Sequence, residues 1–529
     1  MAAGILCSRL AGLVRQRVIA HYFGLTTDAA DAWAAGFRIP NFLQNLFGEG
    51  ALSASFIPVY AALLARGERR EADRVAGGIG ALLALVVSGI VLIGVFATPW
   101  LIGAIAPGFT GAKRQLTVTV VRILFPGAGL LVMSAWCLGI LNSHHRFLLS
   151  YAAPVIWSAS MIVALLWFGA GTALPRLVVI LAWGSVVGSA LQFGIQIPVV
   201  LRVAPYLRLA LWRGAFTPRL ARGARSVSKG NHADVRAVVR NFVPAFFSRG
   251  VVQVSAYIDT LLASLLPTGA VAGLTNAQVL YTLPVSLFGM SVAAAELPAM
   301  SGVTTDSDGA DVLRLRLDSG LRRIAYFVIP SAVAFLALGD IVAAALLQTG
   351  RFRHEDAVYV WGILAGSAVG LLASTLGRLY SSTYYALRDT ATPMRYAIIR
   401  VVLTTVLGYL FAIPLPRLLG APPAWGAAGL TASAGMAGWV EMLLLRATLN
   451  ARIGRTGLPV PYLAKLWGSA GVAAAVAWGS KLATPALHPV VTAILVLGPY
   501  GAVFVAMTFA MRVPEASSAL VRLTRRAPR

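Results

Sequence analysis

Apolar stretches of about 20 residues recur along nearly the whole chain, and they restrict its fold severely. The hydrocarbon core of a bilayer is about 30 Å thick, and a helix needs about 20 mainly apolar residues to cross it. Only 12% of the 529 residues are charged and 58% are hydrophobic, whereas about 25% of a typical soluble domain is charged. The sequence therefore predicts an all-α polytopic membrane protein without a separate soluble domain.

The apolar runs and their basic, proline or glycine breaks predict about fourteen spanning helices. Six precede a long polar stretch, six follow it, and two more end the chain. The expected ranges are 3–24, 29–64, 76–105, 115–141, 150–171, 177–201, 241–266, 272–301, 322–349, 356–386, 394–415, 424–448, 460–483 and 488–511. The N-terminus lacks the features of a cleaved signal peptide, so we expect the first helix to be retained.

The helix pattern predicts four parts of the chain. They are an N-terminal six-helix lobe (1–203), a basic cytoplasmic linker (204–240), a C-terminal six-helix lobe (241–450), and a final helix pair with a basic cytoplasmic tail (451–529).

Weak internal similarity indicates that the two lobes are parallel repeats. Phe37-Arg38-Ile39-Pro40 and Leu46-Phe47-Gly48 in one lobe are placed like Leu280 to Pro284 and Leu287-Phe288-Gly289 in the other. Each match follows the same number of helices in its half, so the repeats are related by an axis along the membrane normal. Such lobes are expected to enclose a central cavity.

The positive charge of the chain is explained by its loops. Lys and Arg total 44 against 19 Asp and Glu, a formal charge of +25, which in a soluble protein suggests nucleic acid as a partner. Here the basic residues gather in alternate loops, such as 66–74, 208–229 and 314–323. Basic loops stay in the cytoplasm, so we expect both termini to lie there. The partners that we expect are membrane lipids, and we expect no nucleic acid as a partner.

Ionisable side chains are concentrated in the first two helices. They are Arg9, Arg15, Arg17, Asp31, Arg38 and Glu49. Charges inside a membrane segment are costly and normally face a cavity or a partner. Arg9 and Arg15 are six residues apart and each lies about 60° to one side of a common helix face, so both can approach one cavity from different depths.

Two interpretations of this cluster stay open. The first is a polar cavity whose guanidinium groups hold an anionic headgroup, because arginine matches phosphate geometry bidentately. In the second, Arg15 and Arg17 reach the headgroup region of the membrane and Arg9 simply pairs with Asp31.

Helix-bending residues fall at similar places in the two halves. The second helix has Pro40, Gly48 and Pro58, and the eighth has Pro284 and Pro298. Such residues are tolerated where a segment lines a cavity. They are static kinks, hinges for alternating access, or both.

The later helices offer fewer candidates for the cavity. Arg249 and Asp259 lie ten residues apart on the seventh helix, and we expect both to face the cavity. Arg378 is a weaker candidate, Glu296 is expected to cap a broken helix, and Glu441 to form a buried pair or lie near the interface.

No motif of an enzyme, metal site or cofactor site is found. The chain has no P-loop, HExxH sequence, aspartate-rich cluster or nucleophile elbow. Cys7 and Cys137 lie in apolar segments without metal-ligand spacing, and we interpret both as packing residues. We therefore expect a transporter without a cofactor or metal, whose energy does not come from ATP hydrolysed by this chain.

Several short sequences resemble one known family. They are Ser8-Arg9-Leu10-Ala11-Gly12-Leu13-Val14-Arg15, Phe23-Gly24, Asp31-Ala32, Phe37-Arg38-Ile39-Pro40-Asn41, and Phe47-Gly48-Glu49-Gly50-Ala51 to Phe56-Ile57-Pro58. They resemble the N-terminal signature of the MurJ (MviN-like) lipid II flippases of the multidrug/oligosaccharidyl-lipid/polysaccharide exporter superfamily. The resemblance is dense over residues 8–60 and sparser at 139–142, 284–298 and 385–393.

The resemblance implies a fold and a set of site residues. The family has two six-helix lobes around a cationic cavity, and a final helix pair that forms a groove for a polyprenyl tail. Its cavity arginines match Arg9 and Arg15, and its helix-two aspartate matches Asp31. Two family arginines are absent, because Gln44 and Val279 stand at their positions.

We expect from the resemblance that the chain flips lipid II, an undecaprenyl-pyrophosphate-linked peptidoglycan precursor, outward across the bacterial inner membrane by alternating access. Arg9, Arg15 and Arg38 would hold the pyrophosphate or sugar of this anionic glycan, and Asp31 would orient an arginine. Arg249 would compensate for the absent arginines. Enzymes of cell-wall synthesis are the implied protein partners.

Three other functions are kept as alternatives. They are a flippase for another polyprenyl-linked glycan, a drug/cation antiporter of the same superfamily, and a non-transporting scaffold in envelope assembly.

Overall fold

The computed structural model describes residues 2–47, 53–144, 146–207, 257–301, 307–485 and 487–517. These residues are mostly helical and contain no strand beyond one isolated bridge between Thr349 and Phe352. The all-α prediction is confirmed. The chain divides into two compact units, residues 1–261 and 262–529, which are described separately.

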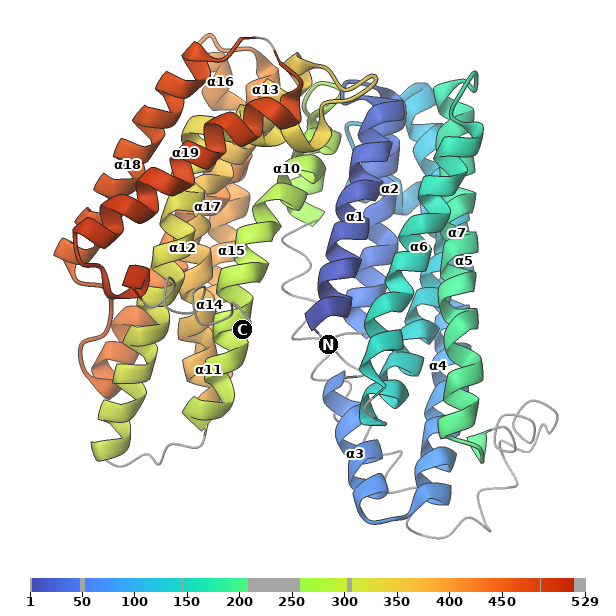
Figure 1. The fold of residues 1–529 in the computed structure, drawn as a ribbon. Coiled ribbons are helices and arrows are strands. Elements are labelled where there is room, and N and C mark those ends of the chain that lie inside the picture. Colours follow the sequence, from blue (N-terminus) through green and yellow to red (C-terminus); the bar gives the residue numbers. More distant parts are fainter. Residues whose placement is uncertain are drawn as a thin grey trace, which may run out of the picture. The chain divides into compact units, whose positions relative to one another are not determined.

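The first unit is a bundle of long helices (Figure 1). They are α1 (Ala2–Phe23), α2 (Asp28–Leu43), α3 (Ser53–Ala65), α4 (Arg69–Ile105), α5 (Gly111–Ser143), α6 (Phe147–Phe168) and α7 (Leu174–Val203). Helix α5 packs against α2, α4 and α7, and α6 packs against α1 and α7. Helix α1 ends at Phe23 because Gly24 takes a φ of 66°, which L-residues with a side chain rarely adopt.

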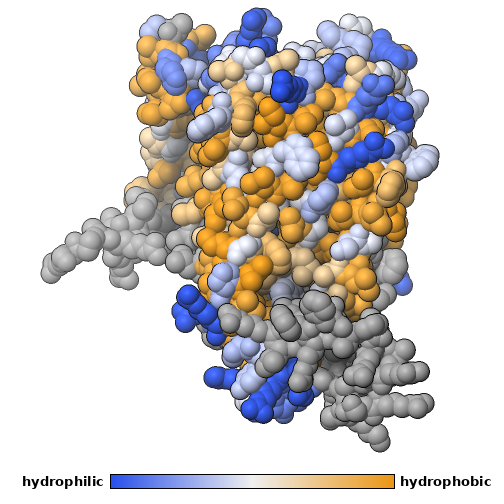
Figure 2. Space-filling model, turned by 90° about the vertical axis from the view of Figure 1, so that its right-hand side faces the viewer, coloured by the Kyte–Doolittle hydropathy of each residue, from blue (hydrophilic) through white to orange (hydrophobic). Residues whose placement is uncertain are grey.

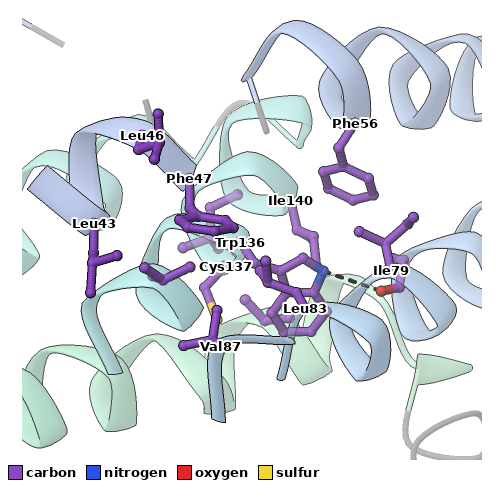
Figure 3. Close-up of a cluster of buried hydrophobic side chains, with 14 of the residues drawn as sticks. Leu43, Leu46, Phe47, Phe56, Ile79, Leu83, Val87, Trp136, Cys137 and Ile140 are labelled. Carbon is purple, nitrogen blue, oxygen red and sulfur yellow. Dashed lines mark hydrogen bonds between the residues drawn. The ribbon is translucent and has the colours of Figure 1, made fainter. Parts of the chain in front are cut away.

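The core of this unit is built around Trp136 on α5 (Figure 3). Its indole nitrogen donates a hydrogen bond of 3.1 Å to the carbonyl oxygen of Ala76 on α4. A Cβ atom at Gly80 would lie only 2.8 Å from the ring, so glycine is needed where α4 approaches it. Side chains from α2, α3, α4 and α5 surround the ring, and Cys137 is buried among them.

The second unit contains the remaining helices. They are α10 (Ala270–Pro284), η3 (Val285–Met290), α11 (Ser291–Ser301), α12 (Ser307–Leu347), α13 (His354–Ala368), α14 (Leu371–Ala386), α15 (Ala391–Ala412), α16 (Pro414–Leu418), η4 (Pro423–Trp425), α17 (Gly426–Ile453), α18 (Val460–Ala483) and α19 (Pro489–Ala510). The final pair, α18 and α19, packs against α12. An ion pair of 2.6 Å between Lys481 and Asp340 joins α18 to α12.

Nine helices of the described residues are long and apolar enough to cross a membrane, or ten if the bent pair α13 and α14 forms one span. The predicted number of fourteen is not confirmed. Helix α1 is not among the nine because Arg9, Arg15 and Arg17 lower its hydropathy, and the expected seventh helix lies mostly outside the described residues. Figure 2 shows hydrophobic side chains over the middle of one face, with hydrophilic ones mainly toward its two ends.

Two predicted helix starts are wrong. Helix α12 begins at Ser307 instead of about residue 322, so the basic residues at 314–323 lie on a helix and not in a loop. Helix α4 likewise begins at Arg69 instead of residue 76. Both helices extend beyond their apolar run through turns stabilised by ion pairs such as Arg314–Asp311, at 2.9 Å, and hydropathy detects only the apolar part.

Candidate functional site

Arg15 of α1 lies in an aromatic cage within the first unit. Its guanidinium carbon is 5.1 Å from the ring centre of Phe37 on α2 and 5.2 Å from that of Trp157 on α6. The two rings stack with centroids 5.4 Å apart, and Arg15 also donates a 3.3 Å hydrogen bond to the hydroxyl of Ser158. Aromatic faces attract cations, so three helices hold this guanidinium in one place.

The charge of Arg15 is not neutralised by a carboxylate in the described part of the chain. Its Nε atom is buried there without a hydrogen-bond partner, and no ion pair to Arg15 is formed among those residues. The rings attract the cation but accept no conventional hydrogen bond. Arg15 therefore keeps donors and positive charge that an anionic ligand can use.

Asp31 forms an ion pair with a lysine of another helix. Its carboxylate is 1% exposed and lies 2.5 Å from the ammonium nitrogen of Lys113, at the start of α5. The ammonium also lies 4.3 Å from the ring centre of Phe109. The structure thus gives Asp31 a lysine partner, and the role of Asp31 in orienting an arginine stays a prediction.

The predicted alternative in which Arg9 pairs with Asp31 is wrong. Asp31 lies in the first turn of α2, next to the end of α1 at Phe23. Arg9 is fourteen residues before Phe23, a distance of about 21 Å along a helix. Arg9 is exposed, and no ion pair joins it to Asp31 in the described ranges.

Arg38 lies further along α2, within electrostatic reach of Asp259 and Tyr257. The Tyr257 ring meets Phe42 edge-on, with ring centres 5.2 Å apart. Asp259 offsets part of the charge of Arg38, so Arg15 is the less neutralised of these two cations. Arg249 lies outside the described residues.

Two of the hinge candidates, Pro40 and Pro284, precede π-helical segments. One covers residues 44–47, after Pro40, and begins at Gln44. The other is η3, which follows Pro284 directly. Proline lacks the N–H that an α-helix needs, and π-turns inside helices are frequent at functional sites.

The two π-helical segments occupy matching places in the sequence repeat. Leu46-Phe47 in one half and Leu287-Phe288 in the other are both π-helical. Pro58 is exposed on α3 and Pro298 lies within α11, whereas Gly48 and Glu49 lie outside the described residues.

Other ionisable residues of the second unit form pairs. Glu441 on α17 accepts a 3.1 Å hydrogen bond from Arg400 on α15, which confirms the predicted pair. Glu296 pairs with Arg323 at 3.5 Å. At the absent family arginine, Val279 is half-buried, next to an exposed Gln278.

The 385–393 motif forms a capped helix start. Asp389 accepts hydrogen bonds from the backbone and hydroxyl of Thr392 and pairs with Arg452 at 2.8 Å. These hydrogen bonds, chiefly those from Thr392, lower the pKa of Asp389 to about 2. The motif therefore fixes the start of α15, while Arg388 takes a left-handed φ of 60° before it.

The described residues contain no group of three or more His, Cys, Asp or Glu side chains that could hold a metal ion. Cys137 is buried, as expected for a packing residue, but Cys7 is exposed. The packing interpretation is therefore wrong for Cys7.

The fold and site define a class of protein, namely a multi-pass membrane protein with an arginine held against aromatic rings among the helices of its first unit. Comparison with known proteins identifies its family. The family model described as "Lipid II flippase MurJ" matches residues 19–511. The chain belongs to this family.

Curated relatives agree with this assignment. "Lipid II flippase MurJ" of Burkholderia cenocepacia is 30% identical over 449 residues, covering 84% of this chain and 82% of the relative. "Probable lipid II flippase MurJ" of Rhizobium meliloti is 30% identical over 470 residues, covering 87% and 81%.

Solved structures show the same fold. "Lipid II flippase MurJ, inward closed conformation" matches with a TM-score of 0.75 and 21% identity, covering 97% of this chain and 98% of the other. An inward-facing multidrug resistance MATE family transporter of the MOP superfamily matches with a TM-score of 0.62 and 18% identity, covering 84% and 95%.

Proposed function

We propose that this chain flips lipid II, an undecaprenyl-pyrophosphate-linked peptidoglycan precursor, from the cytoplasmic to the outer leaflet of the bacterial inner membrane. The observation that carries the proposal is the Arg15 site, a cation inside a membrane unit held by aromatic rings instead of a carboxylate. The names of the curated relatives support the same substrate.

Arg15 is the main contact for the pyrophosphate in this proposal. A guanidinium can donate two parallel hydrogen bonds to a phosphate, and the Nε atom of Arg15 has no partner among the described residues. Arg9, exposed on the same helix, and Arg38, beside Asp259, add positive charge.

Asp31 holds α2 in position and does not contact the ligand in this proposal. Its pair with Lys113 joins the start of α2 to the start of α5, and α2 carries Phe37, one wall of the aromatic cage. A carboxylate that is already paired repels an approaching phosphate less.

Alternating access requires helices that bend without losing their place in the bundle. The matched π-helical segments, at 44–47 and in η3, supply such places in each half. An inside-negative membrane potential favours outward movement of an anion, by about 2.3 kcal/mol per charge per 100 mV.

The proposal includes an orientation. Both termini lie in the cytoplasm, the two six-helix lobes move around the substrate, and the final helix pair shelters the polyprenyl tail. The chain acts as a transporter and not as an enzyme, beside the enzymes of cell-wall synthesis.

The antiporter alternative is less well supported. Cation antiport needs intramembrane carboxylates that are available for Na⁺ or H⁺. Asp31 pairs with Lys113, Asp340 pairs with Lys481, and Glu441 pairs with Arg400. These carboxylates already have protein cations beside them.

Complementation tests the proposal. A host depleted of its own lipid II flippase would express the chain, and growth and outward delivery of labelled lipid II would be measured. The chain should restore both. Arg15→Ala should reduce delivery about tenfold or more, since one charge-assisted hydrogen bond contributes about 1.5–3 kcal/mol.

The matched control is Arg74→Ala, because Arg74 is an exposed arginine of the same unit whose ion pair among the described residues is with neighbouring Glu71. It should keep full activity. Full delivery by Arg15→Ala protein present at normal membrane abundance would refute the proposed role of Arg15. Failure of the unaltered, correctly inserted chain would refute lipid II as its substrate.

A further inference from the structure

A polar stripe runs along α14 in the second unit. Ser374, Arg378 and Ser382 follow one another at intervals of four residues, which places them on one face of the helix. Arg378 is exposed, seven residues from Leu371 and eight from Ala386. Arg378 therefore lies about 10 Å or more along the axis from either end of α14, in the middle of an otherwise uncharged helix.

The guanidinium of Arg378 has no hydrogen bond or ion pair within the residues that the structure describes. Arg400 on α15 and Glu441 on α17 lie within its electrostatic reach. Arg400 already forms an ion pair with Glu441, with 3.1 Å between the guanidinium nitrogen and the carboxylate oxygen. Two arginines therefore share one carboxylate, and the cluster carries one positive charge in excess.

Neighbouring groups fix the position of α14 in this cluster. The Tyr281 hydroxyl on α10 lies 2.6 Å from the Ser374 hydroxyl, which donates to the carbonyl oxygen of Leu371 at 3.1 Å. The Tyr281 oxygen thus keeps acceptor capacity near Arg378, within its electrostatic reach. Tyr281 and Ser374 position the arginine without neutralising it.

Close helix packing also keeps Arg378 near Glu441. A Cβ atom at Gly435 of α17 would lie 2.7 Å from the backbone nitrogen of Gly370, just before α14. The two backbones therefore touch at the bend between α13 and α14, a bend of 44°. Arg378 and Glu441 both follow this contact along their helices, so their spacing depends on rigid backbone.

We infer that Arg378 and Arg400 form a second anion-binding site, within the C-terminal unit, that takes a phosphate-type oxyanion. An uncompensated cation in a membrane helix is costly unless something offsets its charge, and guanidinium groups match phosphate geometry. The inference deepens the proposed function and rests on it in one respect, namely that the oxyanion belongs to the lipid-linked substrate. An anionic headgroup of the surrounding lipid has the same chemistry and is the other source to test.

Binding measurements on the full chain test the site. The protein would be placed in nanodiscs of zwitterionic lipid and titrated with undecaprenyl pyrophosphate, and separately with uncharged undecaprenol. Arg378→Gln should raise the Kd for the pyrophosphate about tenfold, as expected for loss of one charge-assisted contact. It should leave the Kd for undecaprenol unchanged.

Two further variants separate binding from structure. Arg323→Gln is the matched control, because Arg323 is an arginine of the same unit whose carboxylate partner is Glu296 and not Glu441. Its Kd should equal that of the unaltered chain. Glu441→Gln releases Arg400 and should lower the Kd for the pyrophosphate severalfold. A purely structural role predicts the opposite, since loss of the Arg400–Glu441 pair would then weaken binding.

An equal Kd in Arg378→Gln and Arg323→Gln would overturn the inference, and so would weaker binding by Glu441→Gln. Nanodiscs that contain phosphatidylglycerol identify the source of the anion. In one outcome, phosphatidylglycerol competes with undecaprenyl pyrophosphate for the unaltered chain and not for Arg378→Gln. This result would assign the site to the headgroup of a membrane lipid and overturn the substrate assignment.

The two proposals fail in distinguishable ways. In one case, Arg378→Gln loses pyrophosphate binding while the unaltered chain fails to deliver lipid II in the complementation assay. This result would support the site and refute the proposed function. Full delivery and unchanged binding by Arg378→Gln would refute the site and keep the function.

Discussion

Replacing Lys113 by alanine should strongly destabilise the first unit. The ammonium group of Lys113 lies 2.5 Å from the Asp31 carboxylate, and their side chains are 12% and 1% exposed. The other nearby carboxylate, Asp28, is 3.9 Å from the ammonium and is 57% exposed. Lys113→Ala thus leaves a buried carboxylate without its closest cation.

The magnitude follows from the burial of the pair. Removing one partner of a buried ion pair costs about 3–5 kcal/mol, because the other charge stays buried without compensation. Replacing both partners by uncharged groups of similar shape is often close to neutral. Asp31→Asn combined with Lys113→Met should therefore recover most of the stability that Lys113→Ala loses.

The assay is reversible unfolding of the purified protein in mixed micelles, followed by tryptophan fluorescence. Glu71→Gln is the control, since it breaks the exposed Arg74–Glu71 pair, whose side chains are 63% and 26% exposed. Such a pair contributes about 0–1 kcal/mol. The reasoning is refuted if Lys113→Ala is no more destabilising than this control, or if the double variant is as unstable as Lys113→Ala.

Three further predictions concern other parts of the chain. Hydrogen bonds lower the pKa of Asp389 to about 2 in the folded protein, whereas the pKa of an aspartate in the unfolded chain is about 4. These bonds therefore stabilise the fold above about pH 4, and the stabilisation is lost as pH falls from about 4 to 2. Asp389→Asn should flatten the acid limb of a stability–pH profile. Gly94→Ala should cost about 1–3 kcal/mol in unfolding free energy, since its Cβ would lie 2.2 Å from the Phe125 ring, and unchanged stability would contradict this. Trp157→Ala should lower lipid II delivery more than Trp157→Phe, because phenylalanine keeps an aromatic face for Arg15; equal loss in both would mean that the ring face is unimportant.

Hydropathy predicted the fold class well, because the features that make a segment a membrane helix lie within the sequence of that segment. A helix in lipid must satisfy its own backbone hydrogen bonds and expose apolar side chains, and each segment shows this in its own sequence. The starts of α4 and α12 were missed because their first turns project beyond the apolar run. Their polar side chains resemble those of a loop, although ion pairs and helix propensity keep them helical.

The partners of the charged residues were harder to predict because they depend on packing between distant helices. Lys113 follows Asp31 by 82 residues, and the sequence alone places it in a loop between two helices. The aromatic cage around Arg15 was missed for the same reason, because it too is formed by helices that are far apart in the sequence. Arg15 and Ser158 are 143 residues apart. A helical periodicity gives the face of each side chain but not which helix lies opposite that face.

The distribution of charge inside the spanning helices is a better guide to the cargo than the net charge of the chain. The formal charge of +25 belongs largely to basic residues outside the apolar runs of the sequence, and basic residues of this kind commonly set the orientation of a membrane protein. Three carboxylates of the described helices have cations from other helices beside them, in the pairs Asp31–Lys113, Asp340–Lys481 and Glu441–Arg400. After these pairs are formed, the described residues still hold Arg15 in one unit and Arg378 in the other without a carboxylate of their own. Since uncompensated charge in a membrane is costly, each unit by itself favours a ligand that is an anion.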